Sequence, residues 1–391
     1  MSGFDFSPVL RLLMLGSALG CLPFLWALWR HRQASPSARL RALTLLTLFL
    51  TFDLVLFGAF TRLTDSGLGC PDWPGCYGSA SPLGASEEIH AAQTALPSGP
   101  VTHGKAWVEM IHRYLASGVG FLILMLCVMS WRYRARVAEQ IGHAAPSPWW
   151  SVLTLVWVCV QGAFGALTVT MKLFPLIVSL HLLLAFGLLM LLAWQAEAYR
   201  SRTSPPLLQW PASLRRGAWL LLALSLGQAA LGAWVSTNYA VLACAEFPLC
   251  QGQWWPATDF DHGFALWREL GRGHDGQWLS HAALTAIHLT HRVGALLVFT
   301  ALIAYAVLLR RQGGEAGRRW ATRLLLVALW QFLSGLSNVV LGWPMIAALA
   351  HTGGAAALLL MLSFMLARLQ RHDSSELSFP PPQGLSPGAV S

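Results

Sequence analysis

Residues 58–78 read GAFTRLTDSGLGCPDWPGCYG, and residues 232–252 read GAWVSTNYAVLACAEFPLCQG. The two stretches align without a gap. They share two cysteines separated by five residues, a proline inside that interval and a glycine after it. Self-similarity of this kind within one chain indicates a duplicated structural unit. The sequence therefore predicts two copies of one unit, each with a cysteine-bearing loop.

The duplication extends beyond the cysteine loops. EMIHR at 109–113 aligns with HLTHR at 288–292. A further match aligns one Gln, one Gly and one His of each copy: Gln161, Gly165 and His181 with Gln331, Gly335 and His351. Each copy thus has four apolar segments, with a histidine early in the second and another early in the fourth. Because both copies enter from the same side, they are predicted to be parallel repeats about an axis along the membrane normal.

Composition indicates that lipid surrounds most of the chain. Hydrophobic residues make up 55% of the sequence and charged residues only 11%, whereas soluble domains carry about a quarter charged residues. Apolar runs of about 20 residues cross a bilayer as helices, and lipid cannot satisfy the exposed backbone of other structures. Nine spans are predicted, at 9–29, 42–63, 107–131, 149–171, 174–197, 216–238, 282–309, 321–341 and 344–367.

The predicted fold is an all-α integral membrane protein with two pseudo-symmetric four-helix transmembrane bundles and one extra N-terminal span. We divide the chain into four parts: an extra span at 1–39, an N-terminal bundle at 40–200, a C-terminal bundle at 201–370, and a disordered cytoplasmic tail at 371–391. The first span is not a typical signal peptide, because its basic cluster follows the apolar run instead of preceding it.

The net charge of +9 does not indicate nucleic-acid binding, because the arginines gather in the loops on one side of the nine-span arrangement. Cytoplasmic loops carry such an excess of basic residues. The N-terminus and both cysteine loops are therefore expected outside, and the C-terminus in the cytoplasm.

Four histidines occupy equivalent places inside the spans: His112, His181, His291 and His351. Ionisable residues in a bilayer are costly and usually face the bundle interior. Two helices on opposite sides of a bundle can hold a haem between their imidazoles, which are common axial ligands of haem iron. The alternative is a helix–helix hydrogen bond, which is the commoner role for a single histidine. A zinc site is less favoured because neither copy adds a third or fourth clustered ligand.

Glu109 distinguishes the two copies. It precedes His112 by three residues and shares its helix face, whereas its repeat partner is His288. A carboxylate beside one haem can hold or accept a proton. The alternative is that Glu109 only stabilises the helix, because an acidic side chain near the N-terminus interacts favourably with the helix dipole. His281 and His288 are rival ligands for the second haem, although the alignment favours His291. Asp53, in the middle of its span, stays unassigned.

Three arginines lie near the predicted haem sites: Arg62, Arg113 and Arg292. Arginine suits bidentate pairing with carboxylates such as haem propionates. The alternative is that their side chains extend to the lipid headgroups.

Each outer loop carries one cysteine pair, Cys70 with Cys76 and Cys244 with Cys250. Local disulfides are expected in an oxidising outer compartment. They can act as structural links or exchange electrons and thiols near a redox site, and the first pair is the better candidate for exchange.

These features together resemble the haem A synthases of aerobic bacteria and mitochondria, over about residues 40–370. The resemblance rests on TRLTDSGLGC, PDW and PGC within 61–76, on EMIHR at 109–113, on QGAFGALTV at 161–169 with His181, and on the degenerate second copy. The extra first span is not part of the family core.

The resemblance implies oxidation of the C8 methyl group of haem O to the formyl group of haem A. It implies that His112 and His181 bind the substrate haem, that Glu109 is the essential acid, and that His291 and His351 bind a haem b that passes electrons. It also implies a bacterial inner membrane location and disulfides Cys70–Cys76 and Cys244–Cys250 on the outer face.

Other readings stay open. A dihaem membrane electron carrier, such as a quinol oxidase or a cytochrome b561-like reductase, is the alternative enzyme class, and a transporter or assembly scaffold is a third. Partners that fit the resemblance are the farnesyltransferase that makes haem O and oxidase assembly factors. The first span is a place for such docking or only an anchor, and homo-oligomerisation is left open.

Overall fold

The computed structural model describes residues 7–141, 145–200, 208, 210–273 and 275–369. Within these residues the chain is almost entirely helical, with nine helices long and apolar enough to cross a membrane. Their bounds are α1 (Ser7–Arg30), α2 (Pro36–Leu63), α4 (His103–Ile141), α5 (Trp149–Thr170), α6 (Pro175–Ala198), α7 (Ala212–Thr237), α9 (His281–Gln312), α10 (Gly314–Val340) and α11 (Met345–Arg368). The predicted fold class is confirmed. The predicted tail at 371–391 lies outside the described residues.

Each predicted span overlaps one of these helices, and three helices extend beyond their spans by six residues or more: α2 begins at Pro36, α10 begins at Gly314, and α4 ends at Ile141. The third span is predicted to end near residue 131, whereas α4 continues to Ile141. The extra turns carry Arg132, Arg134 and Arg136. Arginine has a high helix propensity, so the helix continues after hydropathy falls. The side chain of Gln140 at this end accepts a hydrogen bond from the main-chain N–H of Ser37, at 3.2 Å, next to the start of α2.

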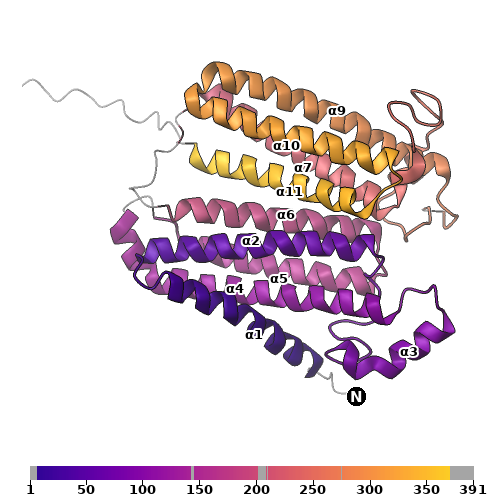
Figure 1. Cartoon of the computed structure of the whole chain (residues 1–391), viewed down its shortest axis with the longest axis horizontal. Coiled ribbons are helices and arrows are strands. Elements are labelled where there is room, and N and C mark those ends of the chain that lie inside the picture. Colours follow the sequence, from indigo (N-terminus) through magenta and orange to yellow (C-terminus); the bar gives the residue numbers. More distant parts are fainter. Residues whose placement is uncertain (1–6, 142–144, 201–207, 209, 274, 370–391) are drawn as a thin grey trace, which may run out of the picture.

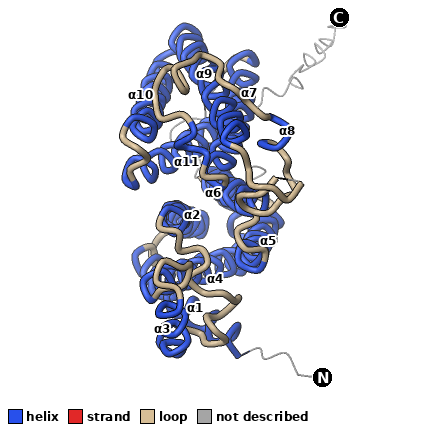
Figure 2. Tube along the Cα trace, turned by 90° about the vertical axis from the view of Figure 1, so that its right-hand side faces the viewer, coloured by secondary structure: helices blue, strands red, loops and turns tan. Residues whose placement is uncertain are grey.

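The helices form two rings of four. In the N-terminal ring α2 packs on α4, α4 on α5, α5 on α6 and α6 on α2; in the C-terminal ring α7 packs on α9, α9 on α10, α10 on α11 and α11 on α7. Helices α4 and α6 are therefore diagonal in one ring, and α9 and α11 are diagonal in the other. Figure 2 shows the two groups of helices.

The two rings meet through α2, α6, α7 and α11. Helices α6 and α11 pack against each other, and each also packs on a helix of the opposite repeat. Buried apolar residues from both rings fill this junction, including Val55, Phe186, Leu221 and Leu359. The pseudo-symmetric copies therefore share one continuous core.

Helix α1 lies outside both rings and packs mainly along α4. Gly16 and Gly20 face α4, where a methyl group on Gly16 would lie 2.2 Å from Ser117 Cβ. Small residues permit this close helix–helix approach inside a membrane. The extra span is thus an integral part of the N-terminal half.

The long loops 64–102 and 238–280 lie at one end of the molecule, at the right of Figure 1. They contain the short helices α3 (Ser86–Ala95) and α8 (Phe260–Gly263) and the 3-10 turns η1 (Pro82–Ala85) and η3 (Ala240–Ala243). Because α4 and α9 begin at this end, the loops cover the ends of the helices that carry the predicted site residues.

Candidate functional site

His112 and His181 come from the two diagonal helices of the N-terminal ring. His112 lies nine residues after the start of α4, and His181 six residues after the start of α6. At about 1.5 Å per residue the two imidazoles lie at similar depth below the loop end. They are within electrostatic range of each other. Both are half-buried, so their rings are partly accessible within the fold.

The C-terminal ring repeats this arrangement with His291 and His351. His291 lies ten residues after the start of α9, and His351 six residues after the start of α11. These two imidazoles are also within electrostatic range of each other and half-buried. Each ring of helices therefore brings one pair of imidazoles together from diagonal positions.

Each of the four imidazoles lies against a glycine of the preceding transmembrane helix. A methyl group on that glycine would nearly touch the ring: 3.0 Å from Gly58 to His112 Nε2, 3.3 Å from Gly165 to His181 Cε1, 3.1 Å from Gly232 to His291 Cε1, and 3.0 Å from Gly335 to His351 Cε1. A side chain at these positions would therefore push the imidazole out of place. The repeated contact sets the position of all four rings.

These residues fit a haem held by two imidazoles in each bundle. The imidazoles come in pairs on diagonal helices, and among the described residues no group of three or more His, Cys, Asp or Glu side chains forms a metal-binding cluster. A paired arrangement suits the two axial positions of haem iron better than the tetrahedral ligand sets of zinc. One nitrogen of His181, Nδ1, is buried without a hydrogen-bond partner among the described residues.

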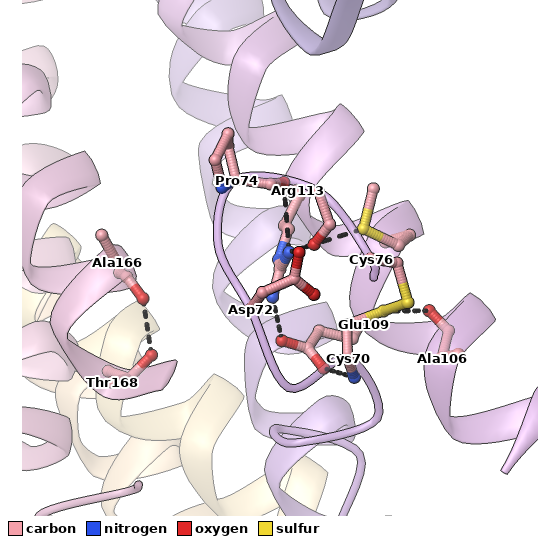
Figure 3. A network of polar contacts seen from close by, with 12 residues as sticks. Cys70, Asp72, Pro74, Cys76, Ala106, Glu109, Arg113, Ala166 and Thr168 are labelled. Atoms are coloured by element: carbon pink, nitrogen blue, oxygen red, sulfur yellow. Dashed lines mark hydrogen bonds and ion pairs between the residues drawn. A yellow bond between two sulfur atoms is a disulfide. The ribbon is translucent and has the colours of Figure 1, made fainter. Parts of the chain in front are cut away.

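Glu109 lies one helical turn before His112 and is only 4% exposed. Its Oε2 accepts a hydrogen bond from the main-chain N–H of Cys70 at 2.8 Å, and its Oε1 pairs with the guanidinium of Arg113 (Figure 3). The carboxylate thus lies beneath the first cysteine loop and is fixed on two sides. The place of Glu109 on the helix was predicted from the sequence, and these contacts were not.

Arg113 fastens the same loop at its other end. Its Nη1 donates to the carbonyl oxygens of Pro74, at 3.1 Å, and Gly75, at 2.5 Å, while its Nη2 pairs with Glu109 (Figure 3). Glu109 and Arg113 therefore hold both ends of the loop against α4. In these contacts the guanidinium faces the loop, and its predicted contact with a haem propionate stays a prediction.

The second loop is held in a related way without an acid. Arg292 donates to the carbonyl oxygens of Leu249, at 3.0 Å, and Cys244, at 2.8 Å. Its Nε donates to His288 Nε2 at 3.2 Å. The Nδ1 of His288 lies 3.0 Å from the carbonyl oxygen of Ala240 and donates to it, because Nε2 accepts. His288 thus replaces Glu109 as the partner of the loop arginine, and its ring is engaged away from His291.

Both cysteine pairs form disulfides, Cys70–Cys76 and Cys244–Cys250. An acid inside each loop fastens the turn that follows it. Asp72 accepts from the N–H groups of Tyr77 and Gly78, at 2.6 and 2.7 Å, and Glu246 accepts from that of Gly252 at 2.7 Å. Gly78 and Gly252 both adopt a positive φ of 71°, which glycine allows without steric cost.

Arg62 links the two halves at the loop end. Its Nη2 donates to the carbonyl oxygen of Ser236 at 2.6 Å, and its guanidinium lies over the ring of Tyr239, 3.9 Å from the centroid. Tyr239 in turn donates to Asp65 at 2.6 Å. Burial raises the pKa of Tyr239 above its ordinary value, so its hydroxyl stays protonated at neutral pH. The predicted propionate contact of Arg62 stays a prediction.

Two further candidates lie apart from the paired imidazoles. His281 is exposed at the start of α9, with Nδ1 3.3 Å from the amide nitrogen of Gln251. Asp53 is exposed on α2 and forms no hydrogen bond or ion pair with any described residue. Neither is brought into a histidine pair.

Three features of the site were not predicted from the sequence. The arginines and acids that fasten the loops were not recognised, because these contacts join segments about 40 residues apart. Gly165 and Gly335 were recognised only as matched positions of the repeat, without their contacts to the histidines. Gln228, which lies against His291, was not aligned with Gln161 and Gln331. The sequence does contain a pattern that identifies Gln228, since each of the three glutamines precedes the contacting glycine by four residues.

Comparison with known proteins relates this chain to one protein family and to several proteins that carry the same name. Residues 41–363 match the sequence profile of the COX15-CtaA family, described as cytochrome oxidase assembly protein. A "Heme A synthase" of Shewanella oneidensis is 39% identical over 326 residues, covering 81% of this chain and 92% of that protein. One from Methylobacterium radiotolerans is 30% identical over 345 residues, with coverages of 82% and 87%. One from Bacillus licheniformis is 26% identical over 345 residues, with coverages of 85% and 97%.

Proposed function

Because the chain belongs to the COX15-CtaA family of cytochrome oxidase assembly proteins, we propose that it is a haem A synthase that oxidises the C8 methyl group of haem O to a formyl group. The observation that carries this proposal is the pair of neighbouring imidazoles on diagonal helices, present once in each repeat. Two such sites suit one haem that reacts and one that passes electrons.

The N-terminal bundle is proposed as the substrate site, with His112 and His181 holding haem O. The reason is chemical asymmetry: this bundle has the Glu109 carboxylate one turn from a haem ligand, whereas the C-terminal bundle has His288 at the equivalent place. Conversion of a methyl to a formyl group removes hydrogen and electrons from carbon and adds oxygen. An acid–base group next to one haem is therefore expected at the reacting site.

The C-terminal bundle is proposed to hold a haem b between His291 and His351. When bound, the two haems supply the reactive methyl group and the path for electrons, and the protein orients them. The chain's own residues position the imidazoles through the four glycine contacts. The two loops cover the helix ends next to this site, and Glu109 is proposed to hold or accept the proton there.

The orientation proposed for the membrane follows from charge. The arginine-rich loops lie at the end opposite to the cysteine loops, and basic loops stay in the cytoplasm. We therefore place both disulfide loops on the outer face of a bacterial inner membrane.

Substitutions of Glu109 test its role directly. Glu109→Ala and Glu109→Gln are both expected to retain haem O and to make little haem A, because neither side chain can exchange a proton as a carboxylate does. Glutamine can still accept the hydrogen bond from the N–H of Cys70 and so preserves part of the loop contact. Pigments extracted from the purified variants and separated by chromatography give the ratio of haem A to haem O.

The two variants separate a chemical role from a structural one. Normal haem A in Glu109→Gln, with loss only in Glu109→Ala, would assign Glu109 to loop fastening and remove it from the reaction. His288→Ala is the matched control, since it loosens the second loop at the equivalent position. This control is expected to keep a high ratio of haem A to haem O.

A further inference from the structure

The transmembrane fold repeats one helix hairpin four times, twice within each bundle. The hairpins pair α2 with α4, α5 with α6, α7 with α9, and α10 with α11. In every one the contacting glycine lies five residues before the last residue of the first helix, and the second helix supplies the histidine. In every one a residue with positive φ follows two places after the first helix: Asp65, Lys172, Tyr239 and Gly342. The four histidine sites can therefore be compared position by position.

Three of the four hairpins carry a glutamine one turn before the glycine, and its amide reaches the histidine. Gln161 donates to the main-chain carbonyl oxygen of His181 at 3.0 Å and lies 3.4 Å from its ring Nε2. Gln228 donates to the main-chain carbonyl oxygen of His291 at 2.9 Å, and its amide nitrogen lies 2.9 Å from the ring Nδ1 of His291.

The third glutamine makes the same contacts. With its amide oriented to satisfy its neighbours, Gln331 donates to the main-chain carbonyl oxygen of His351 at 3.0 Å and lies 3.1 Å from its Nδ1. Ser334 is also 3.1 Å from this nitrogen. The Oε1 atoms of Gln161 and Gln228 are buried without partners among the described residues.

The fourth hairpin departs from this pattern. The residue one turn before Gly58 is Leu54, which packs in the apolar core of the N-terminal half. The ring of His112 forms no hydrogen bond with any described residue. Instead it lies parallel to the ring of Phe57, with centroids 6.2 Å apart and an interplanar angle of 9°.

This difference has a known chemical consequence. A hydrogen-bond partner outside the metal site holds a ligating imidazole in its orientation, and loss of such a partner typically costs about 10–100-fold in metal affinity. The rings of His181, His291 and His351 each lie against a glutamine amide, and the ring of His112 does not. The His112 ring is therefore the least firmly oriented of the four imidazoles.

We propose that His112 is the releasable axial ligand, and that Leu54 in place of glutamine makes the α4 face of the N-terminal site the face that opens. This inference rests on the proposed function, since a substrate haem must be exchanged after each reaction and a resident haem b must not. The three glutamines are positioning residues that keep the other ligands in place.

Carbon monoxide is a suitable probe, because it binds ferrous haem only where an axial ligand leaves. The experiment uses the purified full-length protein, loaded with haem in both bundles, reduced and mixed rapidly with carbon monoxide. In the unchanged protein one haem is expected to react. Leu54→Gln supplies the missing amide and should slow that reaction about tenfold. Leu54→Met, which keeps the site apolar, should react like the unchanged protein.

The reverse change tests the same idea in the other bundle. Gln228→Leu removes the amide from His291 and should make the second haem reactive toward carbon monoxide. Equal rates for Leu54→Gln and Leu54→Met, or no second reactive haem in Gln228→Leu, would overturn the proposal. Failure of the proposed function would appear earlier and separately, as a protein that binds no haem in one or both bundles before carbon monoxide is added.

Discussion

At the scale of single residues, the position of each imidazole depends on the absence of one methyl group. Gly232 contacts His291 from α7, and Gly227 on the same helix has no atom within 4 Å of the place a methyl group would occupy. Both are glycines of α7, but Gly232 lies against the His291 ring and Gly227 faces open space. They therefore provide a matched pair of substitutions.

Gly232→Ala is expected to lower the haem b content, because its methyl group would lie 3.1 Å from His291 Cε1 and the ring would have to shift. Gly227→Ala should keep the haem and slightly stabilise α7, since alanine is favoured over glycine by about 1 kcal/mol in a helix. The pyridine haemochrome spectrum of each purified variant measures haem per protein. Full haem content with an unchanged spectrum in Gly232→Ala would contradict the role assigned to this contact.

Sequence alone could predict the paired histidines, because the duplication aligns His112 with His291 and His181 with His351. It could not predict that Glu109 and Arg113 fasten a loop, because that depends on where residues 70–75 cross α4. Gln228 and Leu54 were hidden for a different reason. The positions of Gln228 and Leu54 can be matched to Gln161 and Gln331 only when the four hairpins are aligned by the last residue of their first helix. Alignment by the cysteine-loop motifs does not reveal this match.

At the scale of elements, each cysteine loop is held to its helix by a forked arginine. Arg113 uses both terminal nitrogens, one for the carbonyl oxygens of Pro74 and Gly75 and one for Glu109. A lysine keeps the charge but lacks this planar fork. The second loop, fastened by Arg292, provides an internal reference in the same molecule.

Arg113→Lys is therefore expected to loosen only the first loop, at a cost of about 1–3 kcal/mol for the lost hydrogen bonds to a buried charged group. The Cys70–Cys76 disulfide should then be reduced faster by dithiothreitol, while the rate for Cys244–Cys250 stays unchanged. Alkylation of the freed thiols followed by peptide mass spectrometry resolves the two pairs. An unchanged rate for Cys70–Cys76 would show that the arginine does not protect the loop.

At the scale of the whole molecule, the two bundles are joined at the end opposite to the cysteine loops by an ion-pair network around Glu197. This carboxylate accepts from Arg368 of the C-terminal bundle at 2.8 Å and from Arg200 at 3.0 Å, and it lies 3.6 Å from Arg41. Its side chain is only 2% exposed. The network connects α6 with the start of α2 and the end of α11.

Glu197→Gln is expected to lower the free energy of unfolding by about 1–3 kcal/mol, because three arginines lose their shared counter-charge. The control is Glu315→Gln, which removes an exposed pair with Arg319 and should cost less than about 1 kcal/mol. Thermal unfolding in detergent compares the two variants. Equal stability would mean that the buried network does not hold the bundles together.

The nine spans and the duplicated architecture could be predicted from sequence, since bilayer thickness and hydrophobic periodicity fix them. The diagonal placement of α4 with α6, and of α9 with α11, could not. It depends on which helix faces pack together, and the lipid-facing and buried faces of these helices are similarly apolar. The four-hairpin repeat was obscured by the long loops inserted into two of its copies.

The most direct test of the account is pigment analysis of the purified protein and of its histidine variants. Acid–acetone extraction and chromatography are expected to give haem B together with haem O or haem A. His291→Ala should lose haem B selectively, and His112→Ala should lose haem O and haem A selectively. Haem B alone, no haem, or haem B that persists in both His291→Ala and His351→Ala would contradict two haems held by separate histidine pairs.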